Sequence, residues 1–125
     1  MSAPPRIMLI IDDEERVSRV LAQYFTIKGY QVTTFTSGED ALTQAETLKP
    51  QVILLDLMMP DMSGFEVLQR LKQRHPQWPV VIVSATDRQE AEPRALQLGA
   101  DAFLTKPVDF STLSATIDRL IHPTS

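Results

Sequence analysis

The feature that most constrains the fold is the regular alternation of short apolar runs with longer amphipathic stretches along the chain. Five runs have the length and composition of strands, at residues 6–11, 31–35, 51–55, 79–83 and 101–105. Three of them are continuously apolar rather than alternating, at 7–11, 52–55 and 80–83. Continuous runs are typical of parallel strands covered on both faces. The pattern therefore predicts a buried parallel sheet.

Helical patterns follow the runs. Apolar residues at helical spacing occupy 17–25, before Gly29, and 110–121 at the end of the chain. Ser37 is expected to cap a second helix, with Asp40 in its first turn. A third helix is expected to begin at Gly64 and to end before Pro76.

Pro93 interrupts the fourth helical stretch. A proline inside a helix lacks the N–H and clashes with the carbonyl four residues earlier, here that of Gln89, at a cost of about 3 kcal/mol. We therefore expect a short helix that begins near Pro93, preceded by a mobile loop from about Thr86 to Glu92.

Five successive strand-helix units predict an α/β fold, a doubly wound parallel sheet with helices on both faces and right-handed crossovers. The size suits the small five-stranded form with strand order 2-1-3-4-5. At 125 residues we expect one domain, with a core at about 6–121 and loose tails at 1–5 and 122–125.

Composition excludes several classes of function. The net charge is −4, with 12 basic and 16 acidic residues and no basic cluster, so nothing favours direct binding to nucleic acid. Without cysteine the chain has neither disulfides nor thiolate metal sites, which agrees with a cytoplasmic protein. No stretch is apolar enough for a signal peptide or a membrane span.

Polar side chains stand where the predicted strands end. Asp12 and Asp13 follow the first strand, Asp56 the third, Ser84 the fourth and Lys106 the fifth. In a doubly wound sheet, ligands bind outside the carboxyl ends of the strands. We therefore expect these side chains to converge at one end of the sheet.

Three clustered carboxylates repel one another, and a hard divalent cation such as Mg²⁺ relieves that repulsion with oxygen ligands. A carboxylate beside Mg²⁺, with a lysine and a hydroxyl aimed at the same point, is equipped to accept a phosphoryl group. Each residue also has a simpler interpretation. The first two aspartates could cap a helix, Asp56 and Ser84 could be turn residues, and Lys106 could be a solvated surface charge. The phosphoryl interpretation is favoured because these simpler roles would have to coincide at one end of one sheet.

The set of motifs "IIDDEE", "LLDLMMPDMSGFE", "IVSAT" and "LGADAFLTKP" resembles the receiver domain of bacterial two-component response regulators, the family of the single-domain chemotaxis regulator. The resemblance covers about residues 6–121. The strand order 2-1-3-4-5 is that of this family, so the order and the resemblance are one expectation.

The resemblance implies a role for each residue at the strand ends. Asp56 would be the phosphoacceptor, attacking the phosphohistidine of a partner sensor histidine kinase or histidine phosphotransfer protein. Asp13 and Asp56 would bind Mg²⁺ directly, Asp12 through water and Met58 through its backbone carbonyl. Ser84 and Lys106 would hold the phosphoryl oxygens.

The resemblance also implies a switch. The Lys106-Pro107 peptide is expected to be cis. Phe103 is the expected switch aromatic, which turns inward when Ser84 moves toward the phosphoryl group. The face formed by the fourth helix, fifth strand and fifth helix would then meet an effector or a second copy. Met58 and Thr86 occupy the positions that tune hydrolysis of the acyl phosphate, and neither carries a charge to orient a water, which implies slow loss of the phosphoryl group.

Rival functions fit less well. A haloacid dehalogenase-type phosphatase needs a second acid where Met58 stands, a flavodoxin-like protein needs a phosphate loop where "DDEE" stands, and no NTPase motif is present. The remaining alternative is a pseudo-receiver, an interaction module that works without phosphorylation. The kinase, the stimulus, the output and the oligomeric state are left open. So is the choice between a stand-alone receiver and part of a longer regulator or hybrid kinase.

Overall fold

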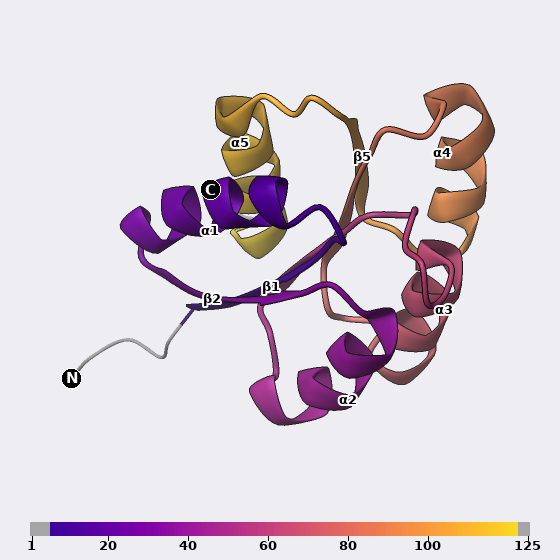
Figure 1. Ribbon diagram of the computed structural model, residues 1–125, viewed down its shortest axis with the longest axis horizontal. Helices are drawn as coiled ribbons and strands as arrows, with labels where there is room; N and C mark the ends of the chain where they lie inside the picture. The colour runs from indigo at the N-terminus through magenta and orange to yellow at the C-terminus, as the bar shows by residue number, and fades with distance from the viewer. Residues whose placement is uncertain (1–5, 123–125) are drawn as a thin grey trace.

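The computed structural model describes residues 6–122, in which five strands alternate with five helices (Figure 1). The strands are β1 (Arg6–Ile11), β2 (Tyr30–Phe35), β3 (Val52–Leu55), β4 (Val80–Ser84) and β5 (Ala102–Thr105). The helices are α1 (Glu15–Ile27), α2 (Gly38–Leu48), α3 (Gly64–Arg74), α4 (Arg88–Gln97) and α5 (Phe110–Ile121). Of the expected tails, residues 1–5 and 123–125 lie outside the described residues, and His122 is exposed just beyond α5. Within 6–122, no helix combines the length and apolarity needed to cross a membrane.

The strands form one parallel sheet in the order β2-β1-β3-β4-β5, which confirms the expected topology. The register pairs Ile11 with Leu55 and Leu55 with Ile82. Because the strands are parallel and in register, the carboxyl ends of β1, β3 and β4 lie side by side. The residues that follow these strands therefore meet at one edge of the sheet.

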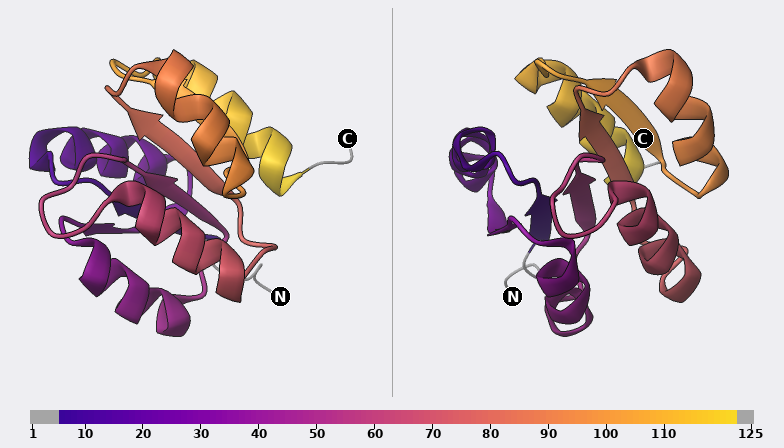
Figure 2. Two further views of the ribbon diagram at one scale, coloured as in Figure 1. Left: turned by 90° about the vertical axis from the view of Figure 1, so that its right-hand side faces the viewer. Right: turned by 45° about the vertical axis from the view of Figure 1, so that its right-hand side comes forward.

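The helices cover both faces of the sheet. Helices α1 and α5 lie on one face, and α2, α3 and α4 lie on the other (Figure 2). Alternate residues of the central strands enter two separate cores, so that Ile10 and Leu54 pack with α1 and α5 while Ile11 and Leu55 pack with the other three helices. This explains why β3 is an unbroken apolar run that is buried at every position.

The signals at the ends of several elements were predicted correctly. The Ser37 hydroxyl caps α2 by accepting a hydrogen bond from the Asp40 N–H at 3.2 Å. Gly29 follows α1 with a φ of +104°, a left-handed conformation that favours glycine. Three strands differ from their expected bounds by one residue at one end, and β4 differs by one residue at both ends, so Ser84 is its last residue rather than the residue after it.

The expectation for the fourth helix was wrong. Helix α4 begins at Arg88 and contains Pro93, so the segment before the proline is helical rather than a loop. The Asp87 side chain caps it by accepting from the Gln89 N–H at 2.9 Å. Arg88 and Glu92 then form an ion pair one turn apart.

The cost of Pro93 is offset in two ways. Ala91 and Ala95, one turn apart, are buried against the core, so the segment does have an apolar face, made of small residues. Pro93 and Gln89 are both exposed, so the Gln89 carbonyl that loses its helical partner lies on the solvent side, where water can satisfy it.

A polar contact ties the loop after β3 to the start of α2. The Asp61 carboxylate accepts hydrogen bonds from the Ser37 hydroxyl at 2.9 Å and from the Gly38 and Glu39 N–H groups at 3.2 Å each. An anion at a helix N-terminus is favourable, because the first N–H groups have no partner within the helix. Asp61 therefore fixes the loop that carries Met58 against a helix of the scaffold.

Candidate functional site

Asp56 is placed by the sheet and by the turn that follows it. Its N–H donates to the Ile11 carbonyl at 2.9 Å, which continues the ladder between β1 and β3. Asp56 is buried, with only 4% of its surface exposed to solvent. Gly64, at the start of α3, packs so closely on the turn that a Cβ there would collide with the Asp56 carbonyl oxygen and the Leu57 backbone. The close approach of Gly64 therefore holds the backbone turn that carries Asp56 against the start of α3.

Asp12 and Asp13 follow the neighbouring strand. Asp12 is 3% exposed, and its Oδ1 accepts a hydrogen bond from the Glu14 N–H at 2.9 Å, whereas Asp13 is exposed. The N-cap of α1 is Glu14, which makes no side-chain capping bond. The capping interpretation thus describes one contact of Asp12, just ahead of the helix, and does not account for Asp13.

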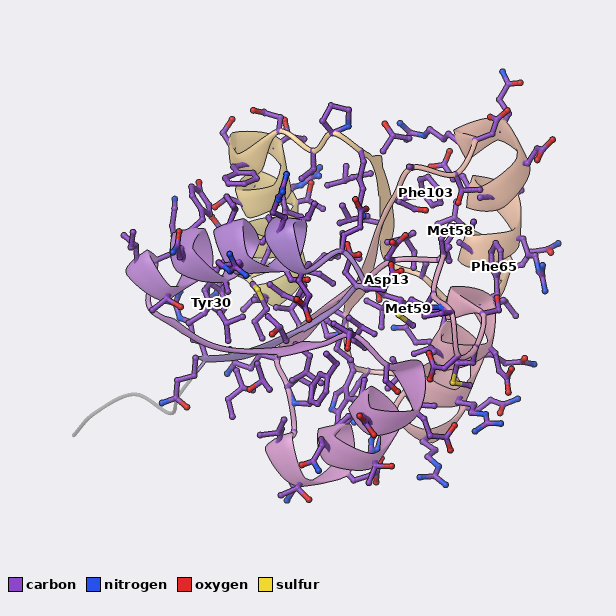
Figure 3. All side chains as sticks on the ribbon, in the orientation of Figure 1. Asp13, Tyr30, Met58, Met59, Phe65 and Phe103 are labelled. Carbon is purple, nitrogen blue, oxygen red and sulfur yellow. The ribbon has the colours of Figure 1, made fainter. Side chains whose placement is uncertain are left out.

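Carboxylate oxygens of Asp12, Asp13 and Asp56 all lie within 4.8 Å of one another. We call these three residues the acidic pocket. Figure 3 shows Asp13 and Met58 at this end of the sheet, where the Met58 N–H donates to Asp56 Oδ1 at 3.3 Å. The convergence predicted from the strand ends is therefore present for the three acids.

Lys106 reaches into the acidic pocket from the end of β5. Its N–H donates to the Ser84 carbonyl at 2.9 Å, and the Lys106-Pro107 peptide is cis, as the resemblance implied. The ammonium Nζ lies 2.8 Å from Asp12 Oδ2 and 3.3 Å from Asp56 Oδ2, and the side chain is 10% exposed. Lys106 is thus a largely shielded partner of the acids and not a solvated surface charge.

Glu14 is a contact that the sequence analysis missed. Its Oε1 lies 2.5 Å from Lys106 Nζ, closer than either aspartate. The available signal was the run "DDEE", whose third acid stands directly beside the two aspartates. With Glu14, three carboxylates contact one ammonium group, and the Asp13 carboxylate stands beside two of them.

Burial and hydrogen bonds shift the pKa values of two groups in the site. Burial raises the pKa of Asp12 from 3.8 to about 6, although the hydrogen bonds from Lys106 and Glu14 oppose the shift. Burial alone would lower the pKa of Lys106, but its hydrogen bonds to Asp12 and Glu14 outweigh burial and hold that pKa well above the ordinary value. The lysine is therefore charged at any physiological pH, and it does not neutralise the cluster.

The donor set of the acidic pocket fits a hard divalent cation. All three side chains offer oxygen, and two of them are buried. Oxygen ligands at this spacing suit Mg²⁺ or Ca²⁺ rather than a metal that prefers nitrogen or sulfur. A cation bound here would offset the charge that Lys106 leaves uncompensated.

The titration of Asp12 predicts an unusual pH dependence in the metal-free protein. Between pH 3.8, its unfolded value, and about 6, its folded value, folded Asp12 holds a proton that the unfolded chain has lost. The folded state then binds more protons, so a rise in pH lowers the free energy of unfolding. The loss is absent below this window and complete above it. For a shift of about two pKa units it amounts to at most about 3 kcal/mol.

Urea unfolding in metal-free buffer across this window, for wild type and Asp12→Asn, measures the effect. We expect the free energy of unfolding to fall with pH in wild type and to fall less in the variant. A stability that rises across the window in wild type, or falls equally in both proteins, contradicts a raised pKa of Asp12.

Asp61 and Asp109 have pKa values lowered by hydrogen bonds, from the Glu39 N–H and from the Thr112 hydroxyl respectively. Their contribution therefore lies below this window.

Ser84 is near the acidic pocket in the sheet, but its hydroxyl is engaged elsewhere. The residue is fully buried, and its Oγ donates to the Thr86 hydroxyl at 2.9 Å and accepts from the Thr86 N–H at 3.2 Å. Among the described residues, no hydrogen bond joins Ser84 Oγ to Asp56 or Lys106. The structure thus brings together the acids and the lysine, and the serine hydroxyl is held by its own loop.

The remaining three predicted residues differ in their exposure. Phe103 is 3% exposed and packs in the core that includes Ala91 and Ala95 of α4, so its ring is already inward (Figure 3). Met58 is 64% exposed at the rim of the acidic pocket. Thr86 is half-buried and bonded to Ser84. Neither Met58 nor Thr86 carries a charge.

The chain matches the family described as response regulator receiver domain over residues 8–118. A curated relative, the alkaline phosphatase synthesis transcriptional regulatory protein PhoP of Bacillus subtilis, is 36% identical over 115 residues, which cover 92% of this chain and 48% of the relative. The chain therefore spans about half the length of that relative.

Two solved structures of response regulators are similar to this chain in both fold and sequence. The BeF3-activated receiver domain of DrrB, from Thermotoga maritima, superposes with a TM-score of 0.87 at 27% identity, covering 95% of this chain and 99% of that one. A response regulator of Burkholderia pseudomallei, solved with a phosphorylated aspartic acid, a calcium ion and citrate, gives a TM-score of 0.84 at 26% identity, covering 90% and 66%.

Proposed function

This chain belongs to the response regulator receiver domain family, and on that premise we propose that Asp56 accepts a phosphoryl group from a phosphohistidine of a partner protein. A receiver domain is a signalling phosphoacceptor rather than a conventional enzyme. The observation that carries the proposal is the largely shielded ammonium group of Lys106, which lies 3.3 Å from Asp56 Oδ2 beside the acidic pocket. A fixed positive charge beside the nucleophile stabilises the negative charge that gathers on the transferred group.

The transfer is a displacement at phosphorus. An oxygen of the Asp56 carboxylate attacks, the bond from phosphorus to the donor imidazole nitrogen breaks, and the nitrogen leaves with the electron pair of that bond. The product is an acyl phosphate on Asp56. The Met58 N–H, 3.3 Å from Asp56 Oδ1, helps to hold the carboxylate in one orientation before the attack.

We assign the metal ligands to the acidic pocket and its rim. Asp13, Asp56 and the Met58 backbone carbonyl would bind Mg²⁺ directly, and Asp12 through a water. The bound ion supplies positive charge that offsets the acids and the phosphoryl oxygens. The similar Burkholderia pseudomallei structure, which holds both a phosphorylated aspartate and a calcium ion, supports a cation at such a site.

We further propose that Ser84 and Lys106 bind the phosphoryl oxygens and that Ser84 starts the switch. To reach the phosphoryl group, Ser84 Oγ must give up its 2.9 Å hydrogen bond to Thr86. Phe103 packs in the same core as Ala91 and Ala95 of α4. A movement at the end of β4 would therefore change the packing of the face formed by α4, β5 and α5. Phosphorylation would shift the population between two packings of this face, which would meet an effector or a second copy.

The donor is proposed to be a sensor histidine kinase or a histidine phosphotransfer protein. An apolar cleft of about 610 Å³ opens beside Lys106 between the start of α1 and the segment that joins β5 to α5. Val17, Val20 and Phe110 line it, and Val20 is 48% exposed. Because Lys106 and Glu14 also line this cleft, a protein docked there would bring its phosphohistidine to the acidic pocket.

We propose that residues 1–125 form one receiver domain with its core at about 6–121. The domain itself would not bind nucleic acid. The net charge of −4 supports the last point. The domain would assist its own phosphorylation through Lys106 and lose the phosphoryl group slowly.

The alternative is a pseudo-receiver that acts without phosphorylation. Binding of beryllofluoride, observed by fluorine NMR with and without Mg²⁺, separates the two. We expect a bound fluoride signal that requires both Mg²⁺ and Asp56, as the similar BeF3-activated DrrB domain suggests. A protein that is folded and saturated with Mg²⁺ but gives no bound signal would favour the pseudo-receiver.

The lifetime of the acyl phosphate is expected to be long, because the exposed Met58 side chain and Thr86 offer no base or amide to position an attacking water. Replacing Met58 with Asn and Thr86 with Glu should speed loss of the phosphoryl group roughly tenfold, equivalent to about 1.4 kcal/mol of barrier. Decay of phosphate from labelled protein measures this. The control is Met58→Leu with Thr86→Val, which removes the same side chains and adds no group that holds water. Equal decay of both double variants would remove these positions from the control of hydrolysis.

A further inference from the structure

We propose that Glu14 is a positioning residue that holds Lys106 back from the phosphoryl site and competes with the phosphoryl group for it. The inference rests on the proposed function of Asp56 and Lys106. Its basis is the closest contact of the lysine, which is to Glu14 Oε1 at 2.5 Å and not to either aspartate.

Three carboxylates already contact the ammonium group of Lys106, which donates hydrogen bonds to Glu14 and Asp56 and forms an ion pair with Asp12. An ammonium group has three donors, and Nζ has three carboxylate partners, on Asp12, Glu14 and Asp56. A phosphoryl oxygen on Asp56 needs one of these donors. Lys106 must therefore release a partner when the domain is phosphorylated.

Glu14 differs from the other two partners. Its side chain is 55% exposed, and it is not among the three acids whose oxygens lie within 4.8 Å of one another. A cation in the acidic pocket would take up charge on Asp12 and Asp56, and Glu14 would remain as the free anion beside Lys106. Glu14 is thus the competitor that persists when the metal is bound.

The backbone fixes Glu14 in this position. Its N–H donates to Asp12 Oδ1 at 2.9 Å, and the residue is the N-cap of α1, so its Cα cannot drift from the pocket while the helix is formed. Glu14 and Lys106 also line the apolar cleft beside the site. The negative charge of Glu14 therefore lies in the cleft through which an anionic phosphoryl group would approach Asp56.

The size of the effect follows from the exposure of Glu14. A partly exposed ion pair contributes up to about 1 kcal/mol, which corresponds to roughly a fivefold change in an equilibrium constant. Removing the Glu14 charge should therefore tighten binding of a phosphoryl analogue roughly fivefold. The same change should weaken Mg²⁺ binding slightly, because one negative charge near the acidic pocket is lost.

The test compares Glu14→Gln with Glu15→Gln. Glu15 is the next residue, is exposed in the first turn of α1 and loses the same charge, so it controls for electrostatics that do not act through Lys106. Fluorine NMR titration at saturating Mg²⁺ gives the beryllofluoride affinity, and calorimetry gives the Mg²⁺ affinity. We expect tighter beryllofluoride and slightly weaker Mg²⁺ binding for Glu14→Gln, and wild-type beryllofluoride affinity for Glu15→Gln. General damage to the site would weaken both ligands. Glu14→Ala, which also lacks the carboxylate, should reproduce the result.

The outcomes separate this inference from the proposed function. If wild type binds beryllofluoride and Glu14→Gln binds it no more tightly than Glu15→Gln, the role of Glu14 is overturned while the phosphoacceptor function stands. If wild type with bound Mg²⁺ does not bind beryllofluoride at all, the phosphoacceptor function fails and the role of Glu14 fails with it.

Discussion

Asp56→Asn is expected to abolish Mg²⁺-dependent phosphorylation by acetyl phosphate while leaving the fold intact. The substitution keeps the shape of the side chain but removes the nucleophilic carboxylate, so no acyl phosphate can form. It also removes one of the three mutually repelling carboxylates of the acidic pocket. In metal-free buffer we therefore expect the variant to be more stable than wild type, by about 1 kcal/mol.

Asp61→Asn is the matched control. Asp61 is an exposed aspartate in the same loop, and an asparagine keeps one of its two accepting oxygens for the start of α2. We expect this variant to be phosphorylated like wild type. Incorporation of phosphate at the wild-type rate into Asp56→Asn, measured by intact mass, would show that another residue is the acceptor.

Mg²⁺ is expected to raise the unfolding temperature of wild type and to leave that of Asp13→Ala almost unchanged. Only the folded chain assembles the three acids, so a ligand for them stabilises the folded state by mass action, by about 2.7 kcal/mol at a concentration 100 times the dissociation constant. Asp13 is exposed and outside both cores, so its truncation should cost little stability by itself.

Thermal unfolding in Mg²⁺ should be compared with unfolding in NaCl of the same ionic strength. The comparison matters because screening alone reduces repulsion among the acids. An equal rise in both salts, or an equal rise in wild type and Asp13→Ala, would count against the acidic pocket as the metal site.

Most of the fold followed from the sequence because its strongest signals are local. The continuous apolar runs of β3 and β4 are buried at every position, as parallel central strands require. The strand order came with the family resemblance rather than from periodicity. Helix α4 was missed because a proline cost was weighed without the compensation, which comes from the Asp87 cap and from the packing of Ala91 and Ala95.

For the candidate site, the sequence predicted which strand ends meet and which residues they carry. Asp12, Asp13, Asp56 and Lys106 converge because the register of a parallel sheet fixes where the chain leaves each strand. The orientation of side chains was not predictable. Ser84 could turn toward the pocket or toward Thr86, and Glu14 could point to solvent or to Lys106, since both choices depend on partners distant in sequence.

The most direct test of the account is the identity of the residue that is phosphorylated. Wild type is treated with acetyl phosphate and Mg²⁺, reduced with borohydride, which converts an aspartyl phosphate to homoserine, digested and sequenced by mass spectrometry. If Asp56 is the phosphoacceptor, we expect homoserine at position 56 and none when Mg²⁺ is withheld. Homoserine at Asp12 or Asp13, or no modification in protein shown to be folded and to bind Mg²⁺, would contradict it.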